Sequence, residues 1–143
     1  MNTQGKARAR LLIVDDEENI QNMLSRHFRL KGYEVMTASD GAEALDIIEK
    51  EKIEVVVSDI MTPKMNGIEL LQEIKKSYPI IHVIIITGYT TVANLLSALQ
   101  YGADTCIFKP MNDMNELEDA VENAVKHLRR WQRKLRELKA MQG

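Results

Sequence analysis

The sequence predicts an α/β fold, a doubly wound parallel sheet of five strands in the order 2-1-3-4-5 with helices on both faces. Three observations predict it. Five short β-rich runs alternate with helical patterns, three of those runs are apolar almost throughout, and every connection between runs is long enough for a helix. Strands that are apolar on both faces belong inside a covered parallel sheet, and the crossovers of such a sheet are right-handed.

The strands are expected at residues 11–14, 34–37, 55–57, 83–86 and 106–108. The first, third and fourth runs are nearly continuous in Leu, Ile and Val, so we place them in the centre of the sheet. The second run alternates between polar and apolar residues, as a strand at the edge of a sheet does.

Apolar residues at helical spacing fill the segments between the strands. Gly32 is expected to end the first helix, and Asp40 to cap the second. The third should end before Pro79, and Gly102 should follow the last turn of the fourth.

The length and composition fit one domain with a helical extension. The chain has 143 residues, of which 45% are apolar. We divide it into a flexible basic N-terminus (1–8), a domain (9–128) and a helical extension (129–143). Residues 126–143 carry seven basic side chains and one acidic, whereas residues 1–125 carry twelve basic and twenty acidic. No apolar run approaches a membrane span and no secretory signal is apparent, so we expect a cytoplasmic protein.

Polar residues follow the ends of four strands. Asp15 and Asp16 follow the first run, Asp59 the third, Thr87 the fourth and Lys109 the fifth. Ligands bind outside the carboxyl ends of the strands in such sheets, so we expect these side chains to converge. Three neighbouring carboxylates require a cation, and their oxygens suit Mg²⁺, with Mn²⁺ as an alternative.

A divalent ion, an ammonium and a hydroxyl around one carboxylate predict a site for phosphoryl transfer. There is no Gly-rich phosphate loop, so nucleotide is not the expected phosphate carrier. The carboxylate can itself act as the nucleophile and form an aspartyl phosphate.

Four motifs in this order resemble the receiver domain of bacterial two-component response regulators, over about residues 8–128. They read Ile13-Val14-Asp15-Asp16-Glu17, Ser58-Asp59-Ile60-Met61-Thr62-Pro63-Lys64-Met65-Asn66-Gly67, Ile86-Thr87-Gly88 and Phe108-Lys109-Pro110. The resemblance implies a CheY-like, flavodoxin-like fold. It also implies that the protein accepts a phosphoryl group from a sensor histidine kinase or a phosphotransfer protein.

The resemblance also assigns roles to residues of the site. Asp59 would be the phosphoacceptor, while Asp15, Asp16, Asp59 and the backbone carbonyl of Met61 would hold Mg²⁺. Thr87 would bind a phosphoryl oxygen. Lys109 would pair with Asp59 and then with the phosphoryl group, and a cis peptide bond is suggested at Pro110.

The sequence departs from the family pattern at a switch position. Cys106 stands where the family usually has Tyr or Phe, so we expect a weaker or different response of the fourth helix and fifth strand. Thr62 and Asn66 are smaller departures that do not touch the expected chemistry. The bulk of Met61 and Tyr89, at positions that tune dephosphorylation, suggests a longer-lived phosphoryl group.

The last helix is longer than a receiver domain needs. Its apolar residues follow heptad spacing: Leu117, Val121, Ala124, Leu128, Trp131, Leu135 and Leu138. We predict a homodimer through this helix, with Leu128, Trp131, Leu135 and Leu138 in the interface. Alternatively, the helix is the start of a linker to an output domain. Nucleic acid and membrane are not expected partners, because no known DNA-reading face is apparent.

The sequence therefore predicts a phosphorylation-dependent signalling switch rather than a metabolic enzyme, with an unknown downstream partner. One alternative is a phosphorylation-independent dimeric scaffold, and another is the receiver fragment of a larger regulator. A Mg²⁺-dependent phosphohydrolase is a third, but such enzymes usually carry an Asp-x-Asp pattern after the first strand, where this chain has Asp15-Asp16-Glu17. A basic-helix DNA-binding protein would require steeply salt-dependent binding to duplex DNA.

Overall fold

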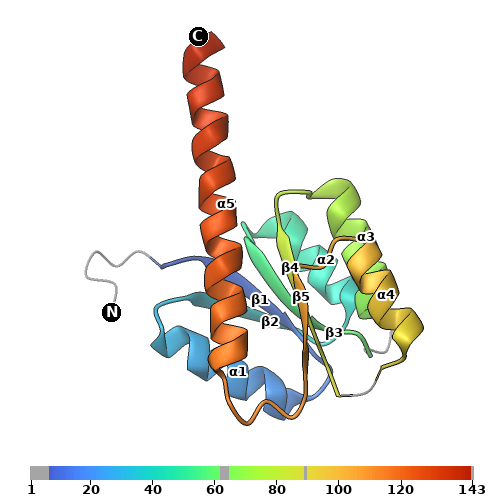
Figure 1. Cartoon of the computed structure of the whole chain (residues 1–143). Helices are drawn as coiled ribbons and strands as arrows, with labels where there is room; N and C mark the ends of the chain where they lie inside the picture. Colours follow the sequence, from blue (N-terminus) through green and yellow to red (C-terminus); the bar gives the residue numbers. More distant parts are fainter. Residues whose placement is uncertain (1–6, 62–64, 89, 143) are drawn as a thin grey trace.

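Five parallel strands form one sheet in the order β2-β1-β3-β4-β5 (Figure 1), which confirms the predicted topology. The structure, a computed structural model, describes residues 7–61, 65–88 and 90–142. The strands are β1 (Arg10–Val14), β2 (Glu34–Ala38), β3 (Val55–Asp59), β4 (His82–Thr87) and β5 (Thr105–Phe108). The helices are α1 (Glu18–Leu30), α2 (Gly41–Lys50), α3 (Gly67–Ser77), α4 (Val92–Gln100) and α5 (Asn115–Gln142).

The helix boundaries follow the predicted capping residues. The Asp40 carboxylate accepts a hydrogen bond from the backbone N–H of Glu43, 2.8 Å away, at the start of α2. Gly32 and Gly102 both have a positive φ after helices α1 and α4, a conformation that glycine adopts without steric cost. Helix α3 ends at Ser77, before Pro79.

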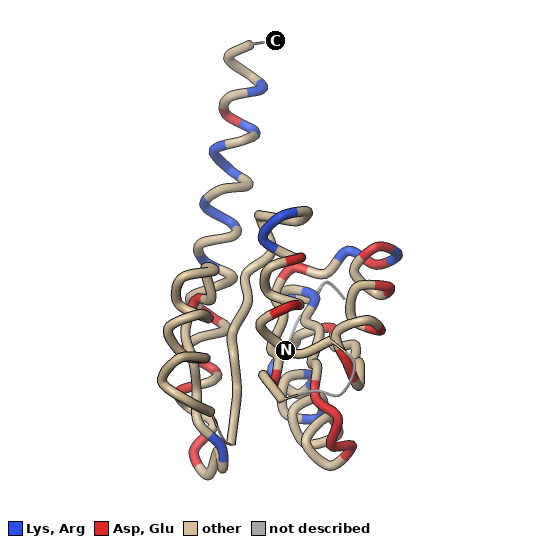
Figure 2. The backbone as a smooth tube through the Cα atoms, turned by 90° about the vertical axis from the view of Figure 1, so that its right-hand side faces the viewer, with Lys and Arg blue, Asp and Glu red and all other residues tan. Residues whose placement is uncertain are grey.

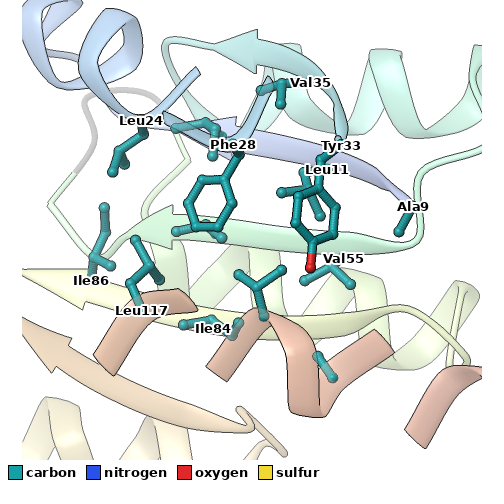
Figure 3. Packing of buried hydrophobic residues seen from close by; sticks show 14 of the residues in the cluster. Ala9, Leu11, Leu24, Phe28, Tyr33, Val35, Val55, Ile84, Ile86 and Leu117 are labelled. Atoms are coloured by element: carbon teal, nitrogen blue, oxygen red, sulfur yellow. The ribbon is translucent and has the colours of Figure 1, made fainter. Parts of the chain in front are cut away.

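Two hydrophobic layers cover the two faces of the sheet. Helices α1 and α5 cover one face, where Phe28 and Leu117 pack against residues of the central strands (Figure 3). Helices α2, α3 and α4 cover the other face with side chains such as Leu70 and Ile74. Because β1, β3 and β4 are buried on both faces, their continuous apolar runs are explained by the fold.

Helix α5 continues well past the body of the domain (Figure 1). Leu117, Val121, Ala124 and Leu128 are buried, whereas Trp131 is 61% exposed. Leu128 was predicted to lie in a dimer interface, but it is only 1% exposed because it packs within its own domain. That part of the prediction is wrong, and the exposed seam begins at Trp131.

Arg129 fixes the point at which α5 leaves the domain. Its guanidinium donates hydrogen bonds to the Glu54 carboxylate and, over 2.9 Å, to the carbonyl of Arg8. Burial alone would raise the pKa of Glu54. The hydrogen bonds from Arg129 and from the backbone N–H of Arg10 outweigh burial and hold the pKa below its usual range.

The N-terminal segment is described from residue 7 onward. Arg8 was assigned to a flexible terminus, but its backbone N–H donates to the carbonyl of Gly32 over 2.9 Å. Its guanidinium also lies 4.7 Å from the centre of the Tyr33 ring. Within the described chain, no helix has both the length and the apolar character needed to span a membrane.

Replacing Phe28 with Ala should destabilise the domain strongly. Phe28 is fully buried between α1 and the sheet, so its truncation leaves a cavity and should lower the free energy of unfolding by about 3–5 kcal/mol. Urea denaturation would measure the change. In the control Leu30→Ala, on the exposed end of the same helix, the change should stay within about 0.5 kcal/mol. Equal losses in the two variants would contradict this packing.

The Glu54–Arg129 pair should make stability depend on pH in the acidic range. Because the folded pKa of Glu54 is depressed, its contribution is present above the unfolded pKa and is lost as pH falls through the folded value. Arg129→Ala should therefore flatten the fall in the free energy of unfolding between about pH 6 and pH 3. Arg130→Ala removes an exposed charge from the next residue and should leave the pH profile unchanged.

Candidate functional site

The carboxyl ends of four strands meet at one edge of the sheet and bring the predicted side chains together. In the strand register Val14 lies beside Ser58, and Asp59 lies beside Ile86. The residues that follow β1 are therefore next to the last residue of β3. On the side of β3 opposite β1, Thr87 is the last residue of β4, and Lys109 directly follows β5.

Three carboxylates form the centre of the site. Oxygen atoms from Asp15, Asp16 and Asp59 all lie within 4.8 Å of one another. Asp15 and Asp59 are buried, whereas Asp16 is exposed. A set of hard oxygen donors with one side open to water suits a divalent cation that keeps part of its hydration shell. These residues therefore fit Mg²⁺.

Lys109 bridges the two buried carboxylates. Its Nζ donates to Oδ2 of Asp15 over 2.7 Å and to Oδ2 of Asp59 over 2.9 Å. Burial alone would lower the pKa of Lys109. The two carboxylates outweigh burial and raise the pKa, so the ammonium stays charged. The lysine thus offsets part of the negative charge gathered at this edge. The Lys109–Pro110 peptide bond is cis.

The environment of Asp15 disfavours the ionised form of its carboxyl group. Burial raises the pKa of Asp15, while the hydrogen bonds from Lys109 and from the backbone N–H of Glu17 act in the opposite direction. The neighbouring Asp59 carboxylate raises it further. A second cation in the site would therefore stabilise the ionised form.

The carboxylate of Asp59 is held on both of its oxygens. Oδ2 accepts from Lys109, and Oδ1 accepts from the backbone N–H of Met61 over 3.0 Å. The side chain of Met61 is 55% exposed beside the site. Asp59 is therefore oriented at the edge of the sheet.

Two supporting residues were missed by the sequence reasoning. A Cβ on Gly67 would lie 2.5 Å from the backbone oxygen of Asp59, so only glycine allows α3 to start this close to the end of β3. Gln21 donates from Nε2 to the carbonyls of Asp15 and Ala38, which fixes the loop after β1. The Asn-Gly pair at the end of the second motif is a signal for Gly67. Gln21 is a single polar residue on a helix, and the sequence contains no comparable signal for its role.

The family model described as the response regulator receiver domain matches residues 11–122. The chain belongs to the response regulator receiver domain family. The predicted family is therefore confirmed, as is the CheY-like fold. Receiver domains act in two-component signalling.

Related proteins and structures agree with this assignment. The probable transcriptional regulator ycf27 of Cyanidium caldarium is 36% identical over 135 residues, which are 94% of this chain and 53% of that protein. The chain thus spans about half the length of this relative. A CheY-like receiver domain from Methanospirillum hungatei is 33% identical, with a TM-score of 0.81 and coverage of 85% of this chain and 97% of that one.

A second similar structure was solved with ligands. It is the response regulator TrrA of Thermotoga maritima in complex with Mg²⁺ and BeF. TrrA is 34% identical, with a TM-score of 0.73, and the match covers 81% of this chain and 98% of that chain.

Cys106, at the position predicted to act as the switch, lies in strand β5. Cys106 is half-buried and packs with the layer formed by α2, α3 and α4, and burial raises the pKa of its thiol. It therefore behaves as a small packing residue. Thr87 is fully buried at the end of the neighbouring strand β4. Tyr89 and Thr62 lie outside the described residues.

Removing the Lys109 ammonium should destabilise this receiver domain. Lys109→Met leaves two buried carboxylates without their shared cation, and the free energy of unfolding should fall by about 3–5 kcal/mol without divalent ions. Addition of Mg²⁺ should recover part of that loss, because it offsets the same charges. Thermal and urea denaturation with and without Mg²⁺ would measure both effects. Lys76→Met, on an exposed part of α3, is the matched control; a similar loss there would contradict the expected role of Lys109.

Proposed function

We propose that this receiver domain is a phosphorylation-dependent switch that accepts a phosphoryl group on Asp59 from a histidine kinase or a phosphotransfer protein. The observation that carries the proposal is the position of Lys109, within hydrogen-bonding distance of both Asp59 and Asp15 beside a cluster of oxygen donors. Phosphoryl transfer requires positive charge around the equatorial oxygens, and this arrangement supplies it.

The step is a displacement at phosphorus. A carboxylate oxygen of Asp59 forms the new P–O bond while the P–N bond of a phosphohistidine breaks, and the imidazole leaves with the bonding electrons. The Lys109 ammonium is placed to move from the carboxylate to a phosphoryl oxygen. Thr87, at the end of β4, is the hydroxyl proposed to bind another oxygen.

Asp15, Asp16 and Asp59 would hold Mg²⁺ or Mn²⁺, with the backbone carbonyl of Met61 as a further ligand. The ion supplies positive charge that neutralises the carboxylates and the incoming phosphoryl group. The complex of TrrA with Mg²⁺ and BeF supports this assignment by similarity. The roles of Met61 and Tyr89 in the phosphoryl lifetime, and of Cys106 in the switch, stay predictions.

In this proposal the protein acts in the cytoplasm through contacts with other proteins. It is not an enzyme with a separate substrate. The greater length of the ycf27 relative supports the alternative that the chain is part of a larger regulator, with α5 leading to an output domain. The homodimer predicted from the heptad stays a prediction. With Leu128 buried, three apolar residues of the proposed interface remain exposed for it, Trp131, Leu135 and Leu138.

Incubation with acetyl phosphate and Mg²⁺ should add one phosphoryl group, detected by intact mass. Asp59→Asn should abolish the adduct and leave the circular dichroism spectrum unchanged, because it removes one charge from a repelling cluster. Asp119→Asn, on the exposed side of α5, is the control and should be phosphorylated as the native protein is.

An adduct that persists in Asp59→Asn would place the phosphoacceptor elsewhere. If the native protein formed neither an adduct nor a complex with beryllofluoride, the phosphorylation-independent scaffold would replace this proposal.

A further inference from the structure

The projecting part of α5 carries an exposed apolar seam, defined here as Trp131, Leu135 and Leu138. These side chains are 61%, 48% and 48% exposed. They continue the heptad that is buried under the domain as far as Leu128, so they lie along one side of the helix. An isolated helix with an uncovered apolar stripe is only marginally stable in water. We therefore expect another surface to cover the seam.

A basic groove of about 470 Å³ lies beside the seam, in the corner between α5 and the amino ends of the central strands. Leu135 is its apolar member, and most of its charged lining is basic: Arg10, Lys52, Arg129, Arg136 and Lys139. Figure 2 shows Lys and Arg gathered along the projecting helix, with the acidic residues mainly on the domain body.

Two of the basic residues of the groove are paired with acidic residues, and three are not paired within the described residues. Arg10 is paired with Glu34 and Glu51, and Arg129 is paired with Glu54. Within the part of the chain that the structure describes, Lys52, Arg136 and Lys139 form no ion pair. The groove thus presents uncompensated positive charge next to an apolar seam.

The charges of the extension do not suit a second copy of the same helix. In a parallel pair, the heptad places Lys134 of one helix at a flank that faces Lys139 of the other, and like charges there repel. Glu137 is the only acidic residue of the extension, and it already pairs with Lys134. Three apolar residues per helix are also few for a stable two-stranded coiled coil.

We propose that the seam and the basic groove together form a docking site for an acidic amphipathic helix of a protein partner. The apolar stripe of that helix covers Trp131, Leu135 and Leu138. Its carboxylates meet Lys52, Arg136 and Lys139. A nucleic-acid backbone would satisfy the charges but offers nothing to cover the apolar seam, so charge and apolarity together favour a protein helix. The inference is independent of the phosphoacceptor chemistry.

Trp131 is the only tryptophan of the chain and lies in the seam, so its fluorescence reports directly on docking. The probe is a tryptophan-free synthetic helix of three heptads with Leu at the two core positions and Glu at the flanking positions. The comparison peptide has Lys in place of every Glu. Titration of the full chain with the Glu peptide should give a saturable blue shift of the emission that weakens as salt is raised. The Lys peptide should give none.

A pair of charge-reversal variants separates the groove from general charge effects. Arg136→Glu with Lys139→Glu should weaken binding of the Glu peptide by at least about tenfold. Arg133→Glu lies on the same exposed helix away from the groove lining, and it should change binding by less than about twofold. Circular dichroism would verify that all variants remain folded.

Three results would overturn the proposal. The first is equal binding of the Lys and Glu peptides, or no binding of either. The second is a dimer at micromolar concentration by sedimentation that Leu135→Asp dissociates, which would make a second copy the occupant. The third is saturable binding of duplex DNA, lost in the double charge-reversal variant, with no binding of the Glu peptide.

Discussion

The contact of Lys109 with Asp15 and Asp59 is the interaction on which the site depends. It joins residues that lie 94 and 50 positions apart in the chain. Each of the two carboxylates would be costly to bury alone, and their mutual repulsion adds to that cost. Both carboxylates can be buried because Lys109, which follows β5, places a cation at the same edge of the sheet. Such a site can take up further positive charge, which the proposed phosphoryl transfer requires.

Much of the fold and of this edge could be predicted from the sequence because both rest on local rules. Apolar runs mark the central strands, and the residues after those runs must meet at the carboxyl edge of a parallel sheet. That is why the sequence alone predicts that Asp15, Asp59 and Lys109 lie together. Gln21 could not, because its contact with the loop after β1 depends on how α1 packs, and a single polar residue on a helix carries no sign of it.

The heptad of α5 shows a different limit. Its seven positions look alike in sequence, yet four are buried under the domain and three are exposed. Periodicity identifies the apolar side of a helix but not which element covers it. The division is set by where the sheet ends and by Arg129, which is hydrogen-bonded to Glu54 and to the carbonyl of Arg8. Those partners lie 75 and 121 positions away, beyond the reach of a local pattern.

The two proposed sites lie at opposite edges of the sheet. The carboxylates lie at the carboxyl ends of β1 and β3, whereas Arg10 and Glu54 lie at the amino ends of the same strands. Helix α5 packs along this sheet between them and then forms one wall of the groove (Figure 1). A change at the phosphoacceptor edge that shifts α5 would therefore alter the angle at which the groove opens, because Leu128 and Arg129 join the buried and projecting parts of one continuous helix. Coupling between the sites needs no contact between them, only two packing arrangements of α5 with different affinities for the two ligands.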